Sequence, residues 1–336
     1  MESDISREFP PQSSVFVTGG SGFVGSHLVE ALCRQNLRVR VLMRKTSSRA
    51  RLPRNVDVIA GDLHDHEALT NAVAGVDTVF HLAAATRARS APEYFHANAE
   101  GTRLLVEAMR TVQPRPRRLV YLSSLAAAGP ALPGKPVQLN DRPCPITAYG
   151  RSKLAGEEFC QQSAKDFEVL MLRAPAVYGP RDRDLLLCFA LAMRGVMLVP
   201  QGPERFLQFI HVSDLVDALL LAATASGAAG VYHIAEPQPY TLGEFAAGLA
   251  QAVGRRVRAV RVPPWCMCLA AAASEFGAKT LGRATIFNRE KVREILASGW
   301  LCETDAAKRD LGFEGQISLP IGLTSTAAWY RKQGWL

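Results

Sequence analysis

Short apolar runs alternate with longer segments of helical periodicity over the first half of this 336-residue chain, and this alternation limits the fold more than any other feature. Between the first two runs, for example, apolar residues recur at the spacing of one helix face. Near-continuous apolar strands joined by helices form a parallel sheet that is covered on both sides. The sequence therefore predicts an α/β fold with a doubly wound parallel sheet. The runs interpreted as strands are residues 15–17, 39–43, 56–60, 78–82, 119–122 and 169–172.

Three glycines, Gly19, Gly22 and Gly25, directly follow the first predicted strand and open the first predicted helix. Glycines at this spacing make a tight turn, let the backbone approach a pyrophosphate, and let helix and strand pack closely. The positive end of the helix then faces the phosphates. We therefore expect a Rossmann-type dinucleotide site, with Phe23 and Val24 of the same turn also contacting the cofactor.

The end of the second predicted strand favours NADP(H) over NAD(H). A site for NAD usually places a carboxylate there to hold the ribose hydroxyls, but this chain has Arg44. A guanidinium pairs well with a 2′-phosphate, and Lys45 and Arg40 are candidate helpers. Asp62, after the third strand, is a candidate acceptor for the adenine amine, although it also fits a helix cap.

Tyr149 and Lys153 stand four residues apart in the predicted helix 148–159, so both side chains project from one face. Ser124 ends the strand 119–122 at the carboxyl edge of the sheet, where such folds bind ligands. A phenol that exchanges a proton near pH 7 needs its pKa lowered from about 10, which takes about 4 kcal/mol. An ammonium about 4 Å away supplies a similar amount at an intermediate dielectric. Ser124, Tyr149 and Lys153 are therefore the predicted catalytic residues.

The periodic pattern loosens after residue 178, where prolines and glycines become frequent. We expect a flexible tail at 1–13, a Rossmann dinucleotide-binding domain at 14–178, and a smaller C-terminal lobe at 179–336 that mainly binds substrate. Within that lobe, residues 206–235 should return to the Rossmann sheet, because 212–225 and 231–234 fit a helix and a strand of the sheet layer.

Composition excludes several other classes of protein. Hydrophobic residues make up 48% and charged residues 21%, which fits a globular protein with a large core. The arginines near residues 34–54 lack interleaved aromatic residues, so we expect no nucleic acid partner. Seven cysteines without paired spacing indicate reduced thiols, no metal site and a cytoplasmic location.

No apolar run reaches the roughly 20 residues that span a bilayer. The nearest approach is the apolar run at 265–273, which continues to Phe276. It predicts a buried helix, while a peripheral membrane contact stays open as the alternative.

At this point the chain resembles the extended short-chain dehydrogenase/reductase family over nearly its whole length. Besides the glycine loop and the Ser124, Tyr149 and Lys153 trio, the matching stretches are 61–63 (GDL), 77–85 (DTVFHLAAA), 98–102 (NAEGT), 172–182 (LRAPAVYGPRD) and 209–214 (FIHVSD). The resemblance implies an NAD(P)-dependent oxidoreductase acting on a small-molecule substrate, and a homodimer. It also implies further cofactor contacts from Asp62, Leu63, Ala83, Ala84, Ser123, Tyr149, Lys153, Pro175 and Val177.

Within the family, the chain is most similar to the 3β-hydroxysteroid dehydrogenase and dihydroflavonol reductase branch. Sugar-nucleotide enzymes often carry an arginine for diphosphate where this chain has Leu207, and Arg205, Arg181 or Arg183 would have to replace it. Dehydratases tend to have an Asp-Glu pair where Leu125 and Ala126 stand.

The resemblance thus implies hydride transfer between nicotinamide and a secondary alcohol or ketone of an apolar, sterol-, lipid- or flavonoid-like substrate. A nucleotide-sugar epimerase or dehydratase, and a non-catalytic nucleotide-binding subunit, stay open as alternatives. In the loop after residue 85, Arg87, Arg89, Tyr94 and His96 are candidates for substrate contact.

Overall fold

Seven parallel strands form the central sheet, in the order β11, β6, β5, β4, β1, β2, β3. The computed structural model describes residues 9–10, 13–280, 285 and 287–336, and the statements below concern these residues. The predicted doubly wound sheet is confirmed, with each predicted strand within three residues of its observed ends. The strands are β1 (Ser14–Thr18), β2 (Arg38–Met43), β3 (Asp57–Ala60), β4 (Thr78–His81), β5 (Arg118–Ser124), β6 (Glu168–Ala174) and β11 (Gly230–His233).

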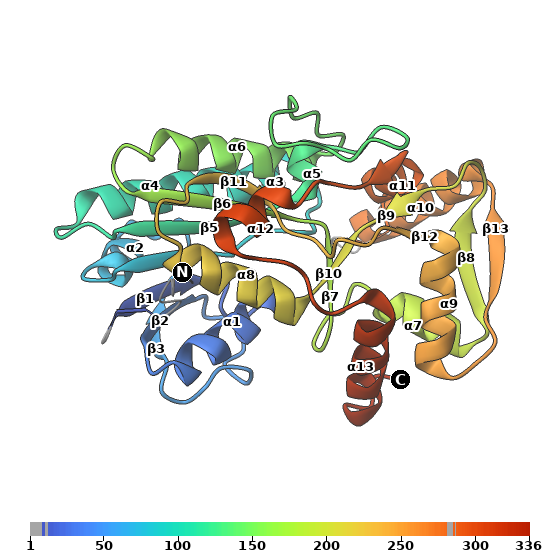
Figure 1. Ribbon diagram of the computed structural model, residues 1–336, viewed down its shortest axis with the longest axis horizontal. Coiled ribbons are helices and arrows are strands. Elements are labelled where there is room, and N and C mark those ends of the chain that lie inside the picture. The colour runs from blue at the N-terminus through green and yellow to red at the C-terminus, as the bar shows by residue number, and fades with distance from the viewer. Residues whose placement is uncertain (1–8, 11–12, 281–284, 286) are drawn as a thin grey trace, which may run out of the picture.

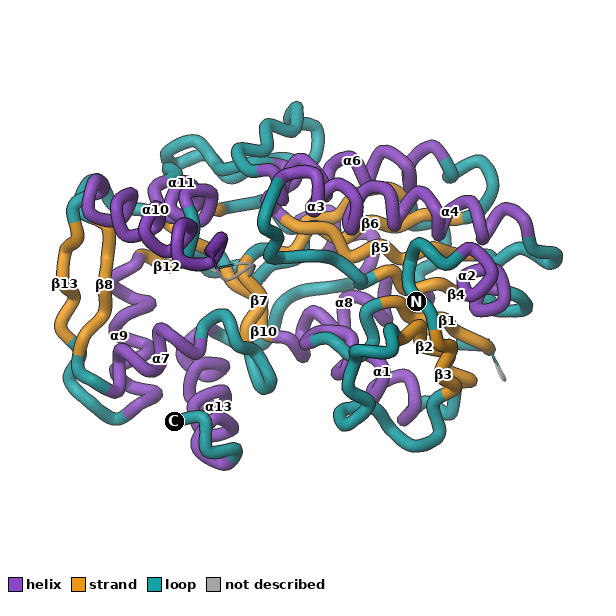
Figure 2. Tube along the Cα trace, turned by 180° about the vertical axis from the view of Figure 1, so that it is seen from behind, coloured by secondary structure: helices purple, strands orange, loops and turns teal. Residues whose placement is uncertain are grey.

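Helices cover both faces of this sheet, and each face has its own apolar core (Figures 1 and 2). One core joins the sheet to α1 (Phe23–Arg34), α8 (Val212–Thr224) and α12 (Asp305–Leu311). The other joins it to α2 (His66–Val73), α4 (Gly101–Thr111) and α6 (Ala148–Gln162). Strands buried on both faces account for the near-continuous apolar runs in the sequence.

A second, smaller lobe has a separate core around Phe189, Phe245 and Tyr330. Three helices supply most of this core, and a pair of parallel strands lies at the outer end of the lobe (Figure 2). These elements are α7 (Leu186–Met193), α9 (Leu242–Val253), α13 (Leu319–Lys332), β8 (Val196–Pro200) and β13 (Arg258–Val262). Short strands connect the lobe to the sheet: β7 (Ala176–Tyr178) pairs with β10 (Phe209–His211), while β9 (Phe206–Leu207) pairs with β12 (Tyr240–Thr241) and β14 (Gly299–Trp300).

The two parts of the chain interleave in sequence. Within 206–235, α8 and β11 belong to the sheet layer, whereas β9 and β10 pair outside the central sheet. Helix α12 also returns to the sheet layer, because it packs against β11 and α8. This second return of the chain was not predicted from the sequence. The expected tail at 1–13 lies outside the described residues, apart from residues 9, 10 and 13.

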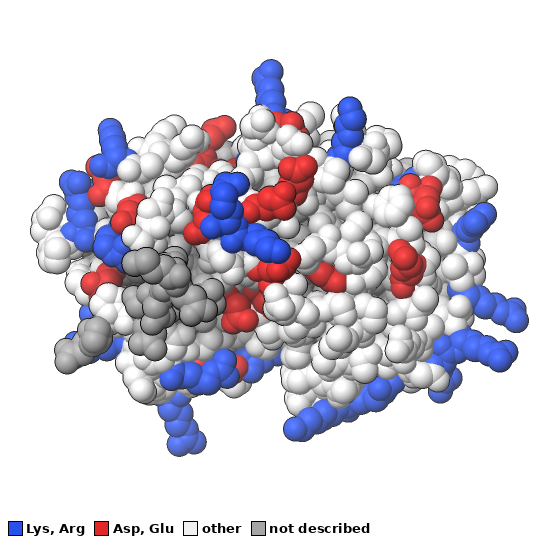
Figure 3. Space-filling model, viewed as in Figure 1, with Lys and Arg blue, Asp and Glu red and all other residues white. Residues whose placement is uncertain are grey.

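Charged side chains of both signs are interspersed over the face shown in Figure 3. The net charge of +8 is therefore not gathered into one continuous stripe on that face. Among the described helices, none combines the length and apolar character that crossing a membrane requires.

The apolar segment after residue 264 is a helix, α10 (Pro264–Thr280), but the prediction that it is buried was wrong. Trp265, Leu269 and Phe276 are 65%, 63% and 73% exposed, and Ala271 is the buried residue of the stretch 264–278. The reason lies in the packing of the lobe, whose core is filled by α7, α9 and α13. Helix α10 packs mainly on α11 (Arg289–Leu296), so one of its faces is left uncovered.

Candidate active site

The glycine loop joins β1 to α1 in a conformation that requires glycine. Gly19 has a φ of +72°, and a Cβ there would lie 2.7 Å from the backbone nitrogen of Ala83. A Cβ on Gly25 would collide with the carbonyl oxygen of Gly19. The backbone of one turn is thereby packed between α1 and the loop after β4.

The amino end of α1 is open to an anion. Gly22 is its N-cap and supplies no side-chain cap, and no acidic residue stands in the first turn. Phe23 and Val24, in that turn, are half-buried. Unpaired amide groups and the helix dipole make such an end suitable for a phosphate. These residues fit the pyrophosphate of a dinucleotide.

The predicted adenosine contacts follow the carboxyl ends of β4 and β2, which flank β1 in the sheet, and of β3, which lies beyond β2. Arg44 is exposed, and its side chain has no ion pair or hydrogen bond with a described residue. Arg40 instead donates to the carbonyl of Ala74 at 2.6 Å and pairs with Asp57 at 3.5 Å, so it is turned away from this edge. Of the three basic side chains predicted to face the 2′-phosphate, Arg44 and the exposed Lys45 are thus available to it.

The other residues predicted to contact the cofactor follow β3 and β4 at the same edge of the sheet. Asp62 accepts from the backbone amide of His64 at 2.8 Å, and Leu63 lies against Gly101 of α4. Ala83 donates its amide to the Thr18 hydroxyl at 3.2 Å, and its neighbour Ala84 is exposed.

Two histidine rings also lie at this edge, which the sequence did not indicate. The rings of His64 and His96 stack beside Asp62, with centroids 3.8 Å apart. His96, a candidate for substrate contact, thus stacks on His64, whose backbone amide donates to Asp62.

Ser124, Tyr149 and Lys153 come from β5 and α6. Ser124 ends β5 and caps the short helix α5 (Leu125–Ala128). Thr147 caps α6, its hydroxyl accepting from the Gly150 amide at 3.1 Å, so the helix begins just before Tyr149. The Lys153 ammonium donates to the carbonyl oxygen of Leu122, which belongs to β5, at 2.8 Å.

Burial shifts the pKa values of both titratable members of this trio. Packing around the half-buried Tyr149 raises its pKa to about 12, while the hydrogen bond with Ser124 acts in the opposite direction. Burial lowers the pKa of Lys153 to about 7. Its ammonium lies 4.0 Å from the centroid of the Tyr121 ring. Lys153 is therefore easily deprotonated. Its side chain bonds to Leu122 of β5 and not to the Tyr149 hydroxyl.

Beneath the trio lies a buried ion pair that sequence reasoning missed. Glu157 accepts from Arg173 of β6 at 2.9 and 2.7 Å, and from the Ser123 hydroxyl at 2.5 Å. Ser123, expected to contact the cofactor, thus directs its hydroxyl into the protein. The spacing of Glu157, one helical turn after Lys153, was the available signal. These bonds tie α6 to β5 and β6.

Pro175 and Val177 lie just beyond the carboxyl end of β6, whose Ala174 is the register partner of Ser124. Both are half-buried. They are therefore close to the trio, at the position expected for the nicotinamide end of the cofactor.

The arginines that were candidates for substrate phosphates are engaged elsewhere. Arg181 donates to Ser26 and to Glu30, and the Arg183 guanidinium lies 5.1 Å from the Trp335 ring. Arg205 is buried and donates to the carbonyl of Pro203 at 3.0 Å. In the loop after β4, Arg87 pairs with Asp184, and Arg89 with Glu93.

Apolar and aromatic groups lie beside the trio, and the carboxylates of Glu294 and Asp184 are close enough to help raise the pKa of Tyr149. Leu125 and Ala126 are buried in α5 next to Ser124, and the Tyr94 ring lies 5.9 Å from that of Tyr149. Leu207, at the position that an arginine often takes in sugar-nucleotide enzymes, is half-buried in β9.

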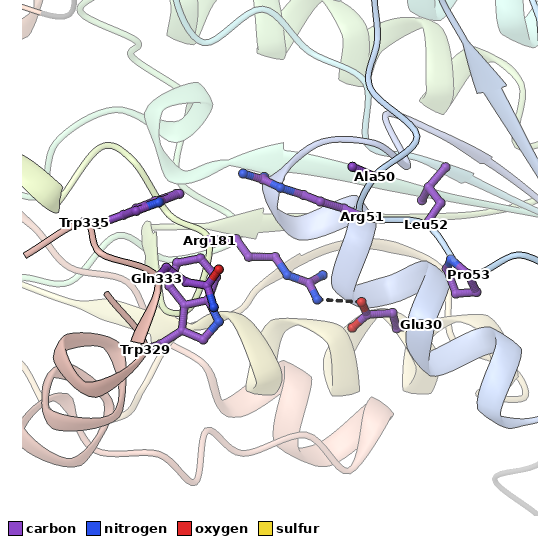
Figure 4. A pocket seen from close by; sticks show the side chains of 9 residues that line it. All are labelled: Glu30, Ala50, Arg51, Leu52, Pro53, Arg181, Trp329, Gln333 and Trp335. Atoms are coloured by element: carbon purple, nitrogen blue, oxygen red, sulfur yellow. Dashed lines mark hydrogen bonds and ion pairs between the residues drawn. The ribbon is translucent and has the colours of Figure 1, made fainter. Parts of the chain in front are cut away.

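A cavity of about 450 Å³ lies away from these residues, between α1, the loop at 50–53 and the C-terminal segment (Figure 4). Arg51, Arg181, Trp329 and Trp335 line it, and Arg181 is held there by Glu30. It contains none of the predicted catalytic or cofactor-binding residues, so it is distinct from the candidate active site.

Known proteins resemble this chain over almost its whole length. A model of the NAD dependent epimerase/dehydratase family matches residues 15–235. A ceramide reductase from Caulobacter vibrioides is 31% identical over 325 residues, or 96% of either chain. A 3-beta-hydroxysteroid dehydrogenase from Mycolicibacterium neoaurum is 31% identical over 272 residues, or 74% of this chain and 72% of that one. The structure of MoeE5 in complex with UDP-glucuronic acid and NAD matches with a TM-score of 0.75 at 27% identity, covering 96% of this chain and 100% of that chain.

These matches confirm the predicted family and the predicted class of enzyme, an NAD-dependent oxidoreductase acting on a CH–OH group. The open helix end, the glycine turn and the sheet edge described above are the structural counterpart of that result. The chain belongs to the NAD dependent epimerase/dehydratase family, the extended short-chain dehydrogenases/reductases.

Proposed function

We propose that this protein is a reductase or dehydrogenase that transfers a hydride between NADP(H) and a secondary alcohol or ketone of an apolar lipid. A ceramide- or sterol-like molecule is the substrate class that fits best. The observation that carries the proposal is the engagement of Arg181, Arg183 and Arg205 with other groups of the protein. A substrate with a diphosphate would leave its charges without a cationic partner, at a cost of several kcal/mol. An apolar substrate needs no such partner.

The proposed roles within the site follow from the side chains. Tyr149 would give its proton to the substrate oxygen during reduction and take it back during oxidation. Ser124 would hold that oxygen by a hydrogen bond. Lys153, once protonated and turned from Leu122 toward Tyr149, would lower the pKa of the phenol. The bound nicotinamide would supply or accept the hydride.

The preference for NADP(H) rests on Arg44, which is exposed and free of partners among the described residues. Residues 14–178 would bind the dinucleotide and the lobe at 179–336 the substrate, with α8, β11 and α12 lying in the dinucleotide-binding half. All seven cysteines are free thiols, which supports a reducing, cytoplasmic location. Homodimer formation is proposed on the family resemblance alone.

The rival function is that of a nucleotide-sugar epimerase or dehydratase, which the match to MoeE5 with UDP-glucuronic acid favours. It would use the same trio. A non-catalytic nucleotide-binding subunit is the third candidate, and it would not need the trio at all.

Substrate competition separates these candidates. The purified protein with NADPH is assayed for absorbance loss at the nicotinamide band, with 3-ketosphingolipids, 3-ketosteroids and UDP-sugars as separate substrates. We expect turnover of at least one apolar ketone and no inhibition by UDP-sugars. Binding of a UDP-sugar with no turnover of any apolar ketone would replace the proposed function by the epimerase. A protein that binds NADPH but turns over none of these would fit the non-catalytic subunit.

A further inference from the structure

Helix α10 presents an apolar stripe that no other described element covers. Trp265, Leu269 and Phe276 are separated by four and seven residues, so they project from one face along three turns. The opposite side carries the contacts to neighbouring segments. Ser274 bonds to Thr285 at 2.7 Å, and Glu275 accepts from the Arg289 amide at 2.7 Å. The exposed face is therefore a property of the folded lobe, because the helix is held in place from behind.

The strands before α10 extend this apolar surface. Leu198 of β8 and Val260 of β13 are register partners, so their side chains share one face of the strand pair. They are 50% and 44% exposed. The chain passes from β13 into α10 within two residues, and both views place these elements side by side at the outer end of the lobe (Figures 1 and 2). Exposed apolar patches of this kind mark interaction sites.

The same region carries only positive charge over a long stretch of sequence. No aspartate or glutamate occurs from residue 245 to residue 274, whereas four arginines do. All four are exposed, and no described residue forms an ion pair or a side-chain hydrogen bond with them. Basic side chains project from the edge of the molecule where β13 lies (Figure 3). The arginines are Arg255, Arg256, Arg258 and Arg261.

We propose that this surface, formed by α10 and β13, docks the protein onto an anionic lipid bilayer. The apolar stripe would enter the boundary between headgroups and acyl chains, where indole rings are favoured, and the arginines would pair with lipid phosphates. A second copy of the chain fits less well. In a two-fold dimer the patch would meet itself, which would bring like-charged arginines together, and residues 245–274 contain no carboxylate to offset them.

Docking at this surface would also place the bilayer near the candidate active site. Helix α10 packs on α11, and Glu290 of α11 accepts from the Ala148 amide at 2.8 Å, one residue before Tyr149. A lipid could pass from the membrane to the trio over this short path. That part of the inference rests on the proposed function, whereas the docking itself does not.

Vesicle flotation tests the docking without cofactor or substrate. The full-length protein is mixed with vesicles of phosphatidylcholine alone, or with added phosphatidylglycerol, at low and high salt. We expect binding to the anionic vesicles, weaker binding to neutral ones, and loss of the difference at high salt. For a Trp265→Ser/Phe276→Ser variant and for an Arg256→Glu/Arg258→Glu variant, the affinity for anionic vesicles should fall by about tenfold or more. The matched control is Arg38→Glu/Arg54→Glu, which reverses two exposed charges on the nucleotide-binding half and should bind like the wild type.

Several outcomes would overturn the docking. Wild-type protein that does not float with anionic vesicles, or surface variants that float as well as the control, would do so. A serine variant that changes from dimer to monomer in sedimentation, while the wild type binds no vesicles, would assign the stripe to a second copy. If the serine variant has a raised KM for a detergent-dispersed substrate and the wild type binds no vesicles, the stripe is part of the substrate cleft. Floating protein that turns over no lipid would instead remove the proposed function and leave the docking intact.

Discussion

The guanidinium of Arg173 donates to both carboxylate oxygens of Glu157, and each of these side chains is only 5% exposed. Removing one partner from a buried pair leaves an uncompensated charge, which typically costs about 3 to 5 kcal/mol. We therefore expect Glu157→Gln to lower the free energy of unfolding by about 3 kcal/mol, measured by urea denaturation.

A double variant distinguishes the pair from general sensitivity of the site. Glu157→Leu/Arg173→Met should recover most of the lost stability, since an apolar pair removes both charges together. The exposed pair Arg89 and Glu93 is the matched control, and Glu93→Gln should have no measurable effect. Equal losses for Glu157→Gln and Glu93→Gln would contradict a special role for the buried pair.

Tyr149→Phe should lower kcat for ketone reduction by about a hundredfold or more, because the variant has no proton to give to the substrate oxygen. The affinity for NADPH, measured by fluorescence titration, should stay within a few-fold of the wild type. Tyr94→Phe serves as the control. The Tyr94 ring lies 5.9 Å from that of Tyr149, and this substitution likewise removes one phenolic hydroxyl. A Tyr149→Phe enzyme with most of its kcat would refute the assigned role.

Arg44→Asp should reverse or narrow the preference for NADPH over NADH, shifting the ratio of the two affinities by about tenfold or more. A carboxylate would repel the 2′-phosphate and accept the ribose hydroxyls. Isothermal titration with both cofactors measures the ratio. Arg38→Asp, an equal charge change at the opposite end of β2, should leave it unaltered. If both variants change the ratio equally, the cofactor preference depends on the net charge of the region and not on Arg44 itself.

Acid should destabilise the protein partly through His233, which is buried in β11. Burial, helped by the charge of Arg173, lowers its pKa from 6.5 to about 4. The unfolded chain then binds a proton between pH 6.5 and 4 that the folded state excludes, so stability falls as the pH falls through that window. His233 should contribute about 2 kcal/mol of the loss between about pH 7 and about pH 5.

The check is the difference in stability between these two pH values, so that any cost of the substitution at neutral pH cancels. In His233→Gln the difference should shrink by about 2 kcal/mol. The exposed His66→Gln should leave it unchanged. An acid loss in His233→Gln equal to that of the wild type would mean that this histidine titrates as it does in the unfolded chain.

Much of the fold could be predicted because the signals are local. A run such as 119–122 is apolar because both faces of its strand are covered, and a glycine such as Gly19 is required where the backbone adopts a positive φ. The spacing of Tyr149 and Lys153 likewise depends only on helix geometry, so the sequence alone placed both side chains on one face of α6.

Contacts between distant segments could not be predicted in this way. Arg40 lies within β2 and Arg44 directly follows it, but Arg40 pairs with Asp57 of β3, whereas Arg44 has no partner among the described residues. Glu157 and Arg173 meet because β6 lies next to β5 beneath α6, which is a matter of strand order.

The sequence by itself determined the alternation of strands and helices, the glycine turn at the nucleotide site and the pattern of the trio. Only the tertiary structure decided that α10 is exposed and that Lys153 donates to Leu122. The physical reason is that local patterns report what a segment can bury or bond. Which surface or partner it reaches depends on how the remaining elements fill the space around it.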